Sequence, residues 1–360
     1  MTAGHLPVMK VTKMLESAKI GVCIQPFSPN MPAFRRRFGY YLKRRGLTWE
    51  LADYNKRYDV VLVHHSGDLT KWKSYANGKI IFDYNDDYLA LKLNGIKSIG
   101  RGLAKFASRR WSGLRLDYRM AYREIMKRAD ATVCCTEAQR AQAVPLCRNV
   151  HKILDLQADP NWSVKKDYTP GAPFNLVWEG LPDFAGLQGL TGVIQNVQQR
   201  YSCALHLVTA LTGFRYLENI CRFSTKDVVA NRFPFKDVWL YEWNSILFTR
   251  IVTACDLGII PINMNDPFWV GKPANKLLFF WRMGMPALVS ATPAYNEMMT
   301  ASGVDMACES EAEWLAKLDV YMNDESLRRG AGQRGLAFVN EHFSEEKQLA
   351  QWDRVLDSVL

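Results

Sequence analysis

One stretch, in which a strand, a long loop, a helix and a second strand follow in order, limits the possible folds of this chain most. The two strands are the apolar runs at residues 257–260 and 287–289. We expect the helix to begin near Ala274, because Pro273 is tolerated at a helix start, where its missing N–H costs nothing. Two successive strands joined by a helix are typical of a parallel sheet.

The loop before this helix has the composition of an anion site. Gly271, Lys272, Asn275 and Lys276 lie at or next to the helix N-terminus, where backbone N–H groups and the helix dipole favour negative charge. Ligands of parallel sheets bind at the carboxyl ends of the strands, which is where this loop begins. We predict that these residues bind a diphosphate. The alternative is a solvated loop with ordinary surface lysines.

Short apolar runs alternate with amphipathic stretches along the whole chain. Further strands are predicted at residues 20–24, 59–63, 79–82, 131–134, 152–154, 174–178, 205–208 and 238–241, and a long helix at residues 34–45. Residues 155–173 are rich in proline and glycine and are predicted to form a linker. The predicted fold class is therefore α/β, with two tandem Rossmann-like domains, an interdomain cleft and a C-terminal helix.

Charge is divided unequally between the two halves. Residues 1–150 contain 27 Lys and Arg against 12 Asp and Glu, a net charge of +15, whereas the remainder contains 19 against 24, a net charge of −5. A strongly basic half favours a polyanionic partner, either a membrane leaflet or nucleic acid. No segment is apolar for the roughly 20 residues that a membrane-spanning helix needs, and we recognise no signal peptide. The eight cysteines include no C-x-x-C pair and are expected to be reduced, buried thiols.

An ordered set of motifs resembles the GT-B glycosyltransferases, and among them the retaining family 4 enzymes. The set consists of the strand that ends at Trp178, Glu179 and Gly180, the D-L-G-I-I-P strand at 256–261, the K-L-L-F-F-W-R-M-G-M-P-A-L-V-S segment at 276–290, and F-S-E-E at 343–346 followed by Trp352. The resemblance implies that the second domain binds a nucleotide-sugar and that transfer proceeds with retention. We accordingly expect an N-terminal domain at residues 1–165 that faces the acceptor and a membrane. A nucleotide-sugar-binding domain would follow at residues 166–343, and then a helix at 344–360 that packs back on the first domain.

The chain departs from the family at two positions. Family 4 enzymes usually carry two glutamates eight residues apart, the second just before the turn that here contains Gly284, and the corresponding positions are Gly271 and Phe279. Asn275 and Lys276 are the nearest polar substitutes. Glu242, at the end of another predicted strand, is a candidate for holding the ribose hydroxyls instead.

Two other strand ends complete the predicted donor site. Gly180 would let the backbone approach a phosphate closely, although a plain tight turn is an equal alternative. Trp243 follows Glu242 and would stack on the base, unless it is a core or hinge residue. The predicted donor-binding residues are Gly180, Glu242, Trp243, Gly271, Lys272, Asn275 and Lys276.

Polar clusters also follow two strands of the first half. His64 and His65 come after one apolar run, and Asp83, Asp86 and Asp87 come after the next. Histidine and carboxylates are the usual general bases, so we predict that His65, Asp83, Asp86 or Asp87 orients or deprotonates an acceptor hydroxyl. The alternative for Asp86 and Asp87 is a helix N-cap.

Basic residues recur every four positions in a segment with interleaved apolar residues and a break near Ser112 and Gly113. The predicted membrane-binding residues are Arg101, Lys105, Arg109, Arg115, Arg119, Arg123 and Lys127. Such segments bind anionic membrane surfaces, but a solvated helix that packs its apolar side on a sheet is the alternative. Residues 35–37 and 43–45 add to the basic charge of the same domain.

These features predict a cytoplasmic glycosyltransferase that is peripheral on the inner face of a membrane. It would move a sugar from a nucleotide-sugar donor to a lipid-linked acceptor, a lipopolysaccharide or another surface glycan. We expect no cofactor and no metal, because lysines and a helix terminus can neutralise the diphosphate. Two alternatives remain: a DNA-modifying sugar transferase of the same fold, with nucleic acid as a less favoured partner, and a non-catalytic GT-B scaffold that binds a glycan or a partner enzyme.

Overall fold

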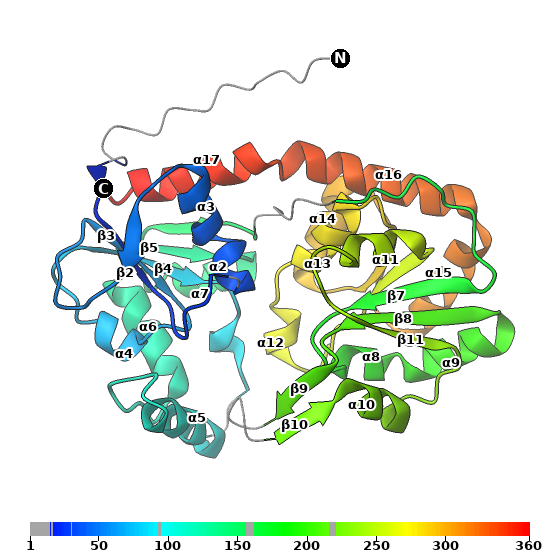
Figure 1. Ribbon diagram of the computed structural model, residues 1–360, viewed down its shortest axis with the longest axis horizontal. Coiled ribbons are helices and arrows are strands. Elements are labelled where there is room, and N and C mark those ends of the chain that lie inside the picture. The colour runs from blue at the N-terminus through cyan, green and yellow to red at the C-terminus, as the bar shows by residue number, and fades with distance from the viewer. Residues whose placement is uncertain (1–14, 16, 30, 93–94, 156–161, 216–220) are drawn as a thin grey trace, which may run out of the picture. The chain divides into compact units, whose positions relative to one another are not determined.

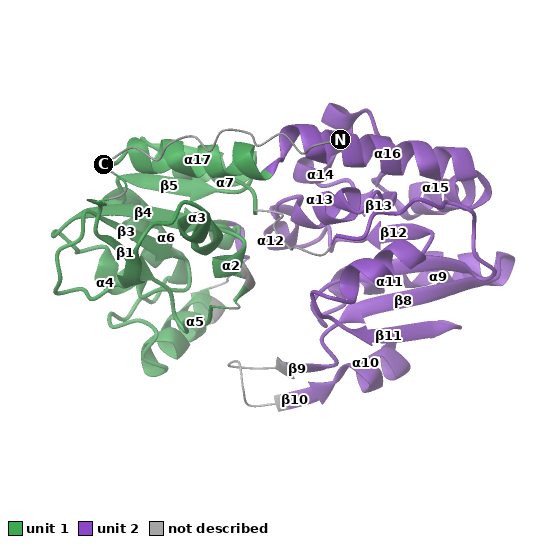
Figure 2. Ribbon diagram, turned by 45° about the horizontal axis from the view of Figure 1, so that its top comes forward, with its two compact units in different colours: residues 1–89, 93–156, 345–360 green, residues 90–92, 157–344 purple. Residues whose placement is uncertain are grey.

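The computed structural model describes residues 15, 17–29, 31–92, 95–155, 162–215 and 221–360 (Figure 1). The chain forms two compact units (Figure 2). Unit 1 comprises residues 1–89, 93–156 and 345–360, and unit 2 comprises residues 90–92 and 157–344. Each unit contains a six-stranded sheet in which every pairing is parallel.

The sheet of unit 1 has the strand order β2-β1-β3-β4-β5-β6. Its strands are β1 (Ile20–Cys23), β2 (Trp49–Leu51), β3 (Val60–His64), β4 (Lys79–Tyr84), β5 (Ala131–Cys134) and β6 (Val150–Lys152). Strands β1, β3 and β5 are buried along their whole length, as expected for a parallel sheet covered on both faces. The helices of the unit are α2 (Pro32–Arg35), α3 (Phe38–Arg44), α4 (Leu69–Trp72), η1 (Tyr88–Ala90), which unit 2 shares through its last residue, α5 (Gly95–Ala107), α6 (Tyr118–Arg128), α7 (Glu137–Ala143) and α17 (Glu345–Asp357).

The helix predicted at residues 34–45 is interrupted. It forms α2 and α3, and Arg37 between them has a φ of −126° and a ψ of −130°, outside the helical range. The sequence analysis counted residues 35–37 toward the basic charge of the domain, and the Arg37 side chain is fully buried. The helix breaks where the backbone turns this guanidinium into the unit.

The last helix of the chain, α17, is part of unit 1. Its Trp352 is fully buried, with its ring 6.2 Å from that of Phe38 and 6.1 Å from that of Tyr41 on α3. Asp353 accepts a hydrogen bond from Tyr41 Oη at 2.9 Å and forms an ion pair with Arg45 at 2.6 Å. These contacts attach the C-terminal helix to α3 through one buried tryptophan and one polar cluster.

The sheet of unit 2 has the strand order β11-β8-β7-β12-β13-β14. Its strands are β7 (Phe174–Glu179), β8 (Cys203–Thr209), β11 (Val238–Glu242), β12 (Leu257–Ile260), β13 (Ala287–Ser290) and β14 (Ala307–Cys308). Strands β9 (Thr212–Arg215) and β10 (Cys221–Ser224) form a separate antiparallel hairpin (Figure 2). The helices of the unit are α8 (Ala185–Gly189), α9 (Thr191–Arg200), α10 (Thr225–Arg232), α11 (Phe248–Ala254), α12 (Pro267–Val270), α13 (Asn275–Arg282), α14 (Pro293–Ser302), α15 (Glu311–Asn323) and α16 (Glu325–His342).

The predicted strand–loop–helix–strand order at residues 256–290 is confirmed. β12 and β13 pair in parallel, and α13 begins directly after its N-cap Ala274. The loop is not continuous, because the short helix α12 forms inside it. Gly284 ends α13 with a φ of +66°, a conformation that glycine adopts at little cost. The linker predicted at 155–173 falls partly on residues 156–161, which lie outside the described residues.

The seven cysteines whose environment the structure describes are free and buried, as predicted: Cys23, Cys134, Cys135, Cys147, Cys203, Cys255 and Cys308.

Candidate functional site

The carboxyl ends of β7, β12 and β13 lie together at one edge of the second sheet, because these strands are parallel neighbours. β7 ends at Glu179, which is followed by Gly180. The first hydrogen bond within α13 runs from Leu278 N to Ala274 O at 3.1 Å. In an α-helix the first N–H groups point toward the space before the N-terminus, which here is the α12 loop. We define the candidate donor site as this strand end, the α12 loop and the first turn of α13.

Lys276 and Gly180, both predicted to bind the donor, lie next to each other. Lys276 Nζ donates a hydrogen bond to the carbonyl oxygen of Glu179 at 2.9 Å and lies 3.8 Å from Glu179 Oε2. The same ammonium lies 5.7 Å from the centre of the Trp178 ring. A Cβ atom on Gly180 would be 2.8 Å from Lys276 Nζ and 2.6 Å from Trp178 Cζ2. A larger residue here would therefore displace the Trp178 ring or the Lys276 ammonium from these positions.

Lys272 is held by aromatic rings. Its ammonium lies 4.3 Å from the centre of the Trp269 ring and 5.1 Å from that of Phe268, both on α12. Asp266 caps this helix by accepting a hydrogen bond from Phe268 N at 3.0 Å. Gly271 is the C-cap of α12 and has an ordinary φ of −76°, so its conformation does not require glycine.

The other predicted donor-binding residues occupy separate places. Asn275 is the first residue of α13 and is half-buried. Glu242 is exposed at the end of β11, and Trp243 N donates to Thr209 O at 2.9 Å. Strand β8 lies between β11 and β7, so the strand ends that carry Glu242 and Gly180 are about 10 Å apart at the usual spacing of a sheet. The structure thus brings Lys276 and Gly180 together and puts Glu242 and Trp243 two strands away.

Asp183, an exposed residue that was not among the predicted site residues, is close enough to Lys276 and Lys272 for their charges to act on it. Burial raises the pKa of Asp183, while the Ala185 N–H and the charges of Lys276 and Lys272 oppose that rise. The charges of both lysines therefore act on this carboxyl group. Asp183 follows the Gly180 turn by three residues, and nothing in its local sequence distinguishes it from a turn residue. It precedes Phe184, which is fully buried with a positive φ of 54°.

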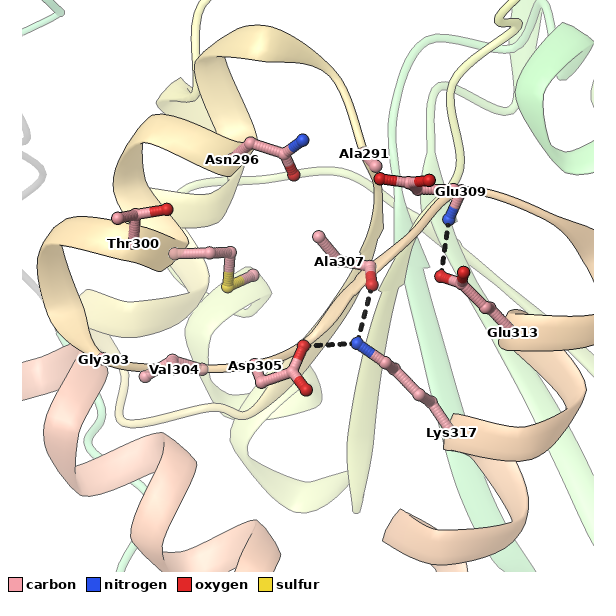
Figure 3. A pocket seen from close by; sticks show the side chains of 11 residues that line it. Ala291, Asn296, Thr300, Gly303, Val304, Asp305, Ala307, Glu309, Glu313 and Lys317 are labelled. Carbon is pink, nitrogen blue, oxygen red and sulfur yellow. Dashed lines mark hydrogen bonds and ion pairs between the residues drawn. The ribbon is translucent and has the colours of Figure 1, made fainter.

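A pocket of about 590 Å³ lies between α14, β14 and α15 (Figure 3). The cation among its lining residues, Lys317, forms an ion pair with Asp305 and donates to Ala307 O at 2.8 Å. Glu313 accepts a hydrogen bond from Glu309 N at 3.0 Å. The pocket is lined by three carboxylates, and its lysine is already paired with one of them. Such a lining suits a negatively charged diphosphate poorly.

Asp83, predicted as a general base, is the partner of Arg37. Arg37 Nε lies 2.9 Å from Asp83 Oδ1 and 2.8 Å from Oδ2, and Nη2 lies 2.6 Å from Oδ1. Arg37 Nη1 donates to Ile153 O and to Asp155 Oδ1, at 3.1 and 3.0 Å. Both Arg37 and Asp83 are at most 1% exposed. Asp83 is therefore a buried carboxylate whose two oxygens both bind the Arg37 guanidinium, and its role as a general base stays a prediction.

The two histidines are in contact with each other. Their ring centres are 3.9 Å apart, and the His65 ring lies 4.9 Å from that of Tyr88. Burial lowers the pKa of His64 to about 3, helped by the charge of Arg37. Burial also lowers the pKa of His65 well below its ordinary value. Both rings are therefore neutral at pH 7, and His65 is the more exposed of the two.

Asp86 and Asp87 differ in exposure. Asp87 is 2% exposed and accepts a hydrogen bond from Tyr84 Oη at 3.2 Å. Asp86 is half-buried, and its charge contributes, after burial, to raising the pKa of Tyr88. Of the three predicted aspartates, Asp86 is the one that is half-buried, whereas Asp83 and Asp87 are buried.

The basic residues predicted to bind a membrane fall on α5, α6 and the segment between them. Arg115 is paired with Glu124 at 2.9 Å, and Arg119 with Asp117 at 3.2 Å. Lys105 is half-buried, and burial with the nearby Arg110 and Arg101 lowers its pKa to about 8. The remaining four side chains, those of Arg101, Arg109, Arg123 and Lys127, are exposed.

Within the residues that the structure describes, no helix is long and apolar enough to cross a membrane. The same residues contain no group of three or more His, Cys, Asp or Glu side chains arranged to hold a metal ion.

Comparison with solved structures decides the fold. The structure of sucrose-phosphate synthase from Thermosynechococcus elongatus aligns with this chain at a TM-score of 0.60 and 13% identity. The alignment covers 92% of this chain and 80% of the synthase chain. A mutant of S. aureus TarM, in complex with Fondaparinux, alpha-GlcNAc-glycerol and UDP, matches 83% of this chain with a TM-score of 0.55 and 9% identity. The chain has the GT-B fold of glycosyltransferases. It spans about half the length of TarM, 55% of that chain.

A third GT-B structure, trehalose-6-phosphate from E. coli bound with UDP-2-fluoro glucose, matches 82% of this chain with a TM-score of 0.51 and 10% identity. No family model matches the chain, and no curated protein matches it by sequence. The likeness is therefore one of GT-B fold, and the narrower resemblance to the retaining family 4 enzymes rests on the motifs alone.

Proposed function

We propose that this protein is a glycosyltransferase that moves a sugar from a nucleotide-sugar to a glycan acceptor. The observation that carries the proposal is the position of Lys276, on the first turn of α13 and against Gly180 at the end of β7. This is the ligand-binding edge of a parallel sheet. Two of the GT-B structures described above contain UDP or a UDP-sugar, which supports a nucleotide-sugar donor.

The site chemistry matches the departure of a nucleoside diphosphate. When the bond from the sugar to the diphosphate breaks, negative charge grows on the leaving phosphate, and cations fixed beforehand stabilise it. Lys276 has three N–H donors, and the carbonyl of Glu179 occupies one of them. A second donor can reach a phosphate oxygen while the lysine stays anchored. We assign the same role to Lys272 and to the N–H groups of residues 275–277, and we expect no metal to be required.

For the acceptor we propose a lipid-linked glycan, a lipopolysaccharide or another surface glycan, reached from the cytoplasmic face of a membrane. The net charge of +15 on residues 1–150 supports a membrane partner over a neutral soluble sugar. His65 and Asp86 are half-buried residues that follow the carboxyl ends of β3 and β4, and they are the candidates for orienting the acceptor hydroxyl. Retention at the anomeric carbon is proposed from the motifs alone.

A non-catalytic scaffold is the second candidate function, and one observation favours it. Phe279 occupies a position where family 4 enzymes carry a glutamate, and it is only 7% exposed. Its ring lies 5.4 Å from that of Trp162 and 6.4 Å from that of Phe248. This side chain is part of the apolar core of unit 2 and has no polar function to contribute.

A ligand screen by thermal unfolding separates the two candidates. Nucleoside diphosphates and nucleotide-sugars are each added at increasing concentration to the purified protein. A ligand at about 100 times its Kd stabilises the folded state by roughly 2.7 kcal/mol, a clear rise in Tm. A rise with one nucleotide, together with turnover of its sugar conjugate on a glycan acceptor, supports the transferase. Binding without turnover supports the scaffold, and absence of nucleotide binding contradicts the proposed donor site.

A further inference from the structure

Helix α5 presents apolar side chains to solvent along one face. Ile96 is 83% exposed, Ile99 37%, Leu103 45% and Phe106 45%. These residues are spaced by three or four positions, so they lie on one side of the helix. A surface helix of a globular domain ordinarily turns such a face toward the core. In α5 the residues packed inward are instead small or polar, for example Ser98 and Gly102.

The segment that joins α5 to α6 adds further exposed apolar side chains next to α5. A Cβ atom on Gly102 would lie 1.8 Å from the carbonyl oxygen of Arg115, so the segment crosses α5 in direct contact with it. On either side of Arg115, Leu114 is 40% exposed and Leu116 is 59% exposed, and Met120 on α6 is 41% exposed. We call these seven side chains the α5 apolar surface: Ile96, Ile99, Leu103, Phe106, Leu114, Leu116 and Met120.

The surroundings of the α5 apolar surface are basic. Residues 95–128 contain ten Lys and Arg but only two carboxylates, Asp117 and Glu124. Both carboxylates are occupied by arginines of the same segment, at 3.2 and 2.9 Å. Exposed cations remain at Arg101 and Arg109 near α5 and at Arg123 and Lys127 on α6.

We propose that the α5 apolar surface inserts into the interfacial region of an anionic lipid bilayer, with the exposed cations at the level of the lipid phosphates. The proposal rests on the proposed function, since it specifies how the enzyme would reach a lipid-linked acceptor. Apolar area and basic charge both contribute to interfacial binding of an amphipathic helix. Each Lys or Arg near an anionic surface adds to the attraction, which fades within about a Debye length.

Charge complementarity selects this occupant over two others. A second copy of the chain would bring its own cations against these, without free carboxylates to pair with them. The phosphates of a nucleic acid would pair with the cations. The seven apolar side chains, however, would lie against polar phosphates and sugars and would not be stabilised by that contact. A lipid leaflet accepts both the apolar side chains and the cations. The proposal also changes which residues matter: Arg115 and Arg119 hold the segment in place, and the α5 apolar surface binds the lipid.

The test measures co-sedimentation of the full-length protein with vesicles of phosphatidylcholine alone or mixed with phosphatidylglycerol. We expect binding to the mixed vesicles and weak binding to the neutral ones. The double variant Leu103→Ser/Phe106→Ser should weaken binding by about tenfold or more, because two large apolar side chains no longer leave water. The matched control is Leu51→Ser/Val144→Ser, which changes two side chains of similar exposure elsewhere in unit 1, 51% and 49%, and should bind as wild type.

A second readout separates insertion from contact by charge alone. In a Phe106→Cys variant, an environment-sensitive fluorophore on the new thiol should shift to shorter wavelength on the mixed vesicles and be quenched by brominated acyl chains. Equal binding by the two double variants, or a label that stays in water, would overturn the proposal. So would a wild-type dimer, seen by sedimentation velocity, that the Leu103→Ser/Phe106→Ser variant dissociates. Nucleotide binding measured without lipid reports on the proposed function independently, so either idea can fail alone.

Discussion

The carboxyl edges of the two sheets carry polar clusters at equivalent places, but the clusters differ in what they leave accessible. In unit 1, Arg37 and Asp83 are buried and their polar atoms bind each other. In unit 2, Lys276 is 39% exposed and binds the backbone of Glu179. The comparison teaches that position at a strand end does not by itself define a binding residue. What matters is whether hydrogen-bonding capacity remains after the fold has been satisfied.

The largest effect is expected from separating the buried pair of unit 1. Arg37→Met leaves Asp83 as an unpaired buried carboxylate and should cost about 3–5 kcal/mol of unfolding free energy. The matched control is Arg44→Met, which removes a cation from the exposed pair with Glu345 on α17 and should cost about 0–1 kcal/mol. Urea denaturation measures both. A stable Asp83→Asn variant that binds nucleotide but has lost turnover would support the predicted role of Asp83 as a general base.

The buried histidine next to this pair should make stability depend on pH. The folded-state pKa of His64 is about 3, below its value in the unfolded chain, about 6.5. As pH falls below 6.5 the unfolded chain takes up a proton that the folded chain does not. Stability is therefore complete above pH 6.5 and should fall by about 1.4 kcal/mol per pH unit from this residue, until pH approaches 3.

The measurement is urea denaturation between pH 7.5 and 4.5, with wild type compared with His64→Gln. The unfolding free energy of the variant should depend less steeply on pH, with a slope smaller by the equivalent of about one bound proton. This difference in slope does not depend on the stability of the variant at pH 7.5. Parallel curves would show that the histidine is not buried in its neutral form.

A smaller effect is expected at the edge of the second sheet. Gly180→Ala would place a Cβ atom 2.6 Å from the Trp178 ring and 2.8 Å from Lys276 Nζ, so both side chains must move. We expect a loss of about 1–2 kcal/mol and weaker nucleotide binding. Gly192→Ala on α9 is the control, because no atom lies within 4 Å of the added Cβ. It should stabilise the protein by roughly 0.5–1 kcal/mol. Equal effects of the two changes would contradict the close packing of Lys276 against Gly180.

Much of the fold could be predicted because it is encoded locally. Strands β5 and β12 were predicted at residues 131–134 and 257–260, where continuous apolar runs end in polar residues or proline. The hairpin of β9 and β10 was not predicted, because each strand has only four residues and β9, Thr-Gly-Phe-Arg, contains a single large apolar residue.

The site was harder to predict because its contacts are distant in sequence. Lys276 and Gly180 were named from local chemistry, but Asp183 joins them only through the folding of the Gly180 turn. The same reason explains why the burial of Arg37 was not predicted, since its partner Asp83 lies 46 residues away and two other arginines precede it. Its local sequence does not distinguish it from Arg35 and Arg36.

The central claim is that the carboxyl edge of the second sheet binds a nucleoside diphosphate through Lys276. Isothermal titration of the best nucleotide from the screen tests it, with Lys276→Met compared with Lys317→Met. The control lysine also donates to a backbone carbonyl in unit 2, at 2.8 Å, but lies in the pocket between α14 and α15. Loss of one charge-assisted contact should cost about 1.5–3 kcal/mol, roughly a 10- to 150-fold higher Kd for Lys276→Met, with Lys317→Met equal to wild type. Unchanged affinity in Lys276→Met, or an equal loss in both variants, would contradict the account.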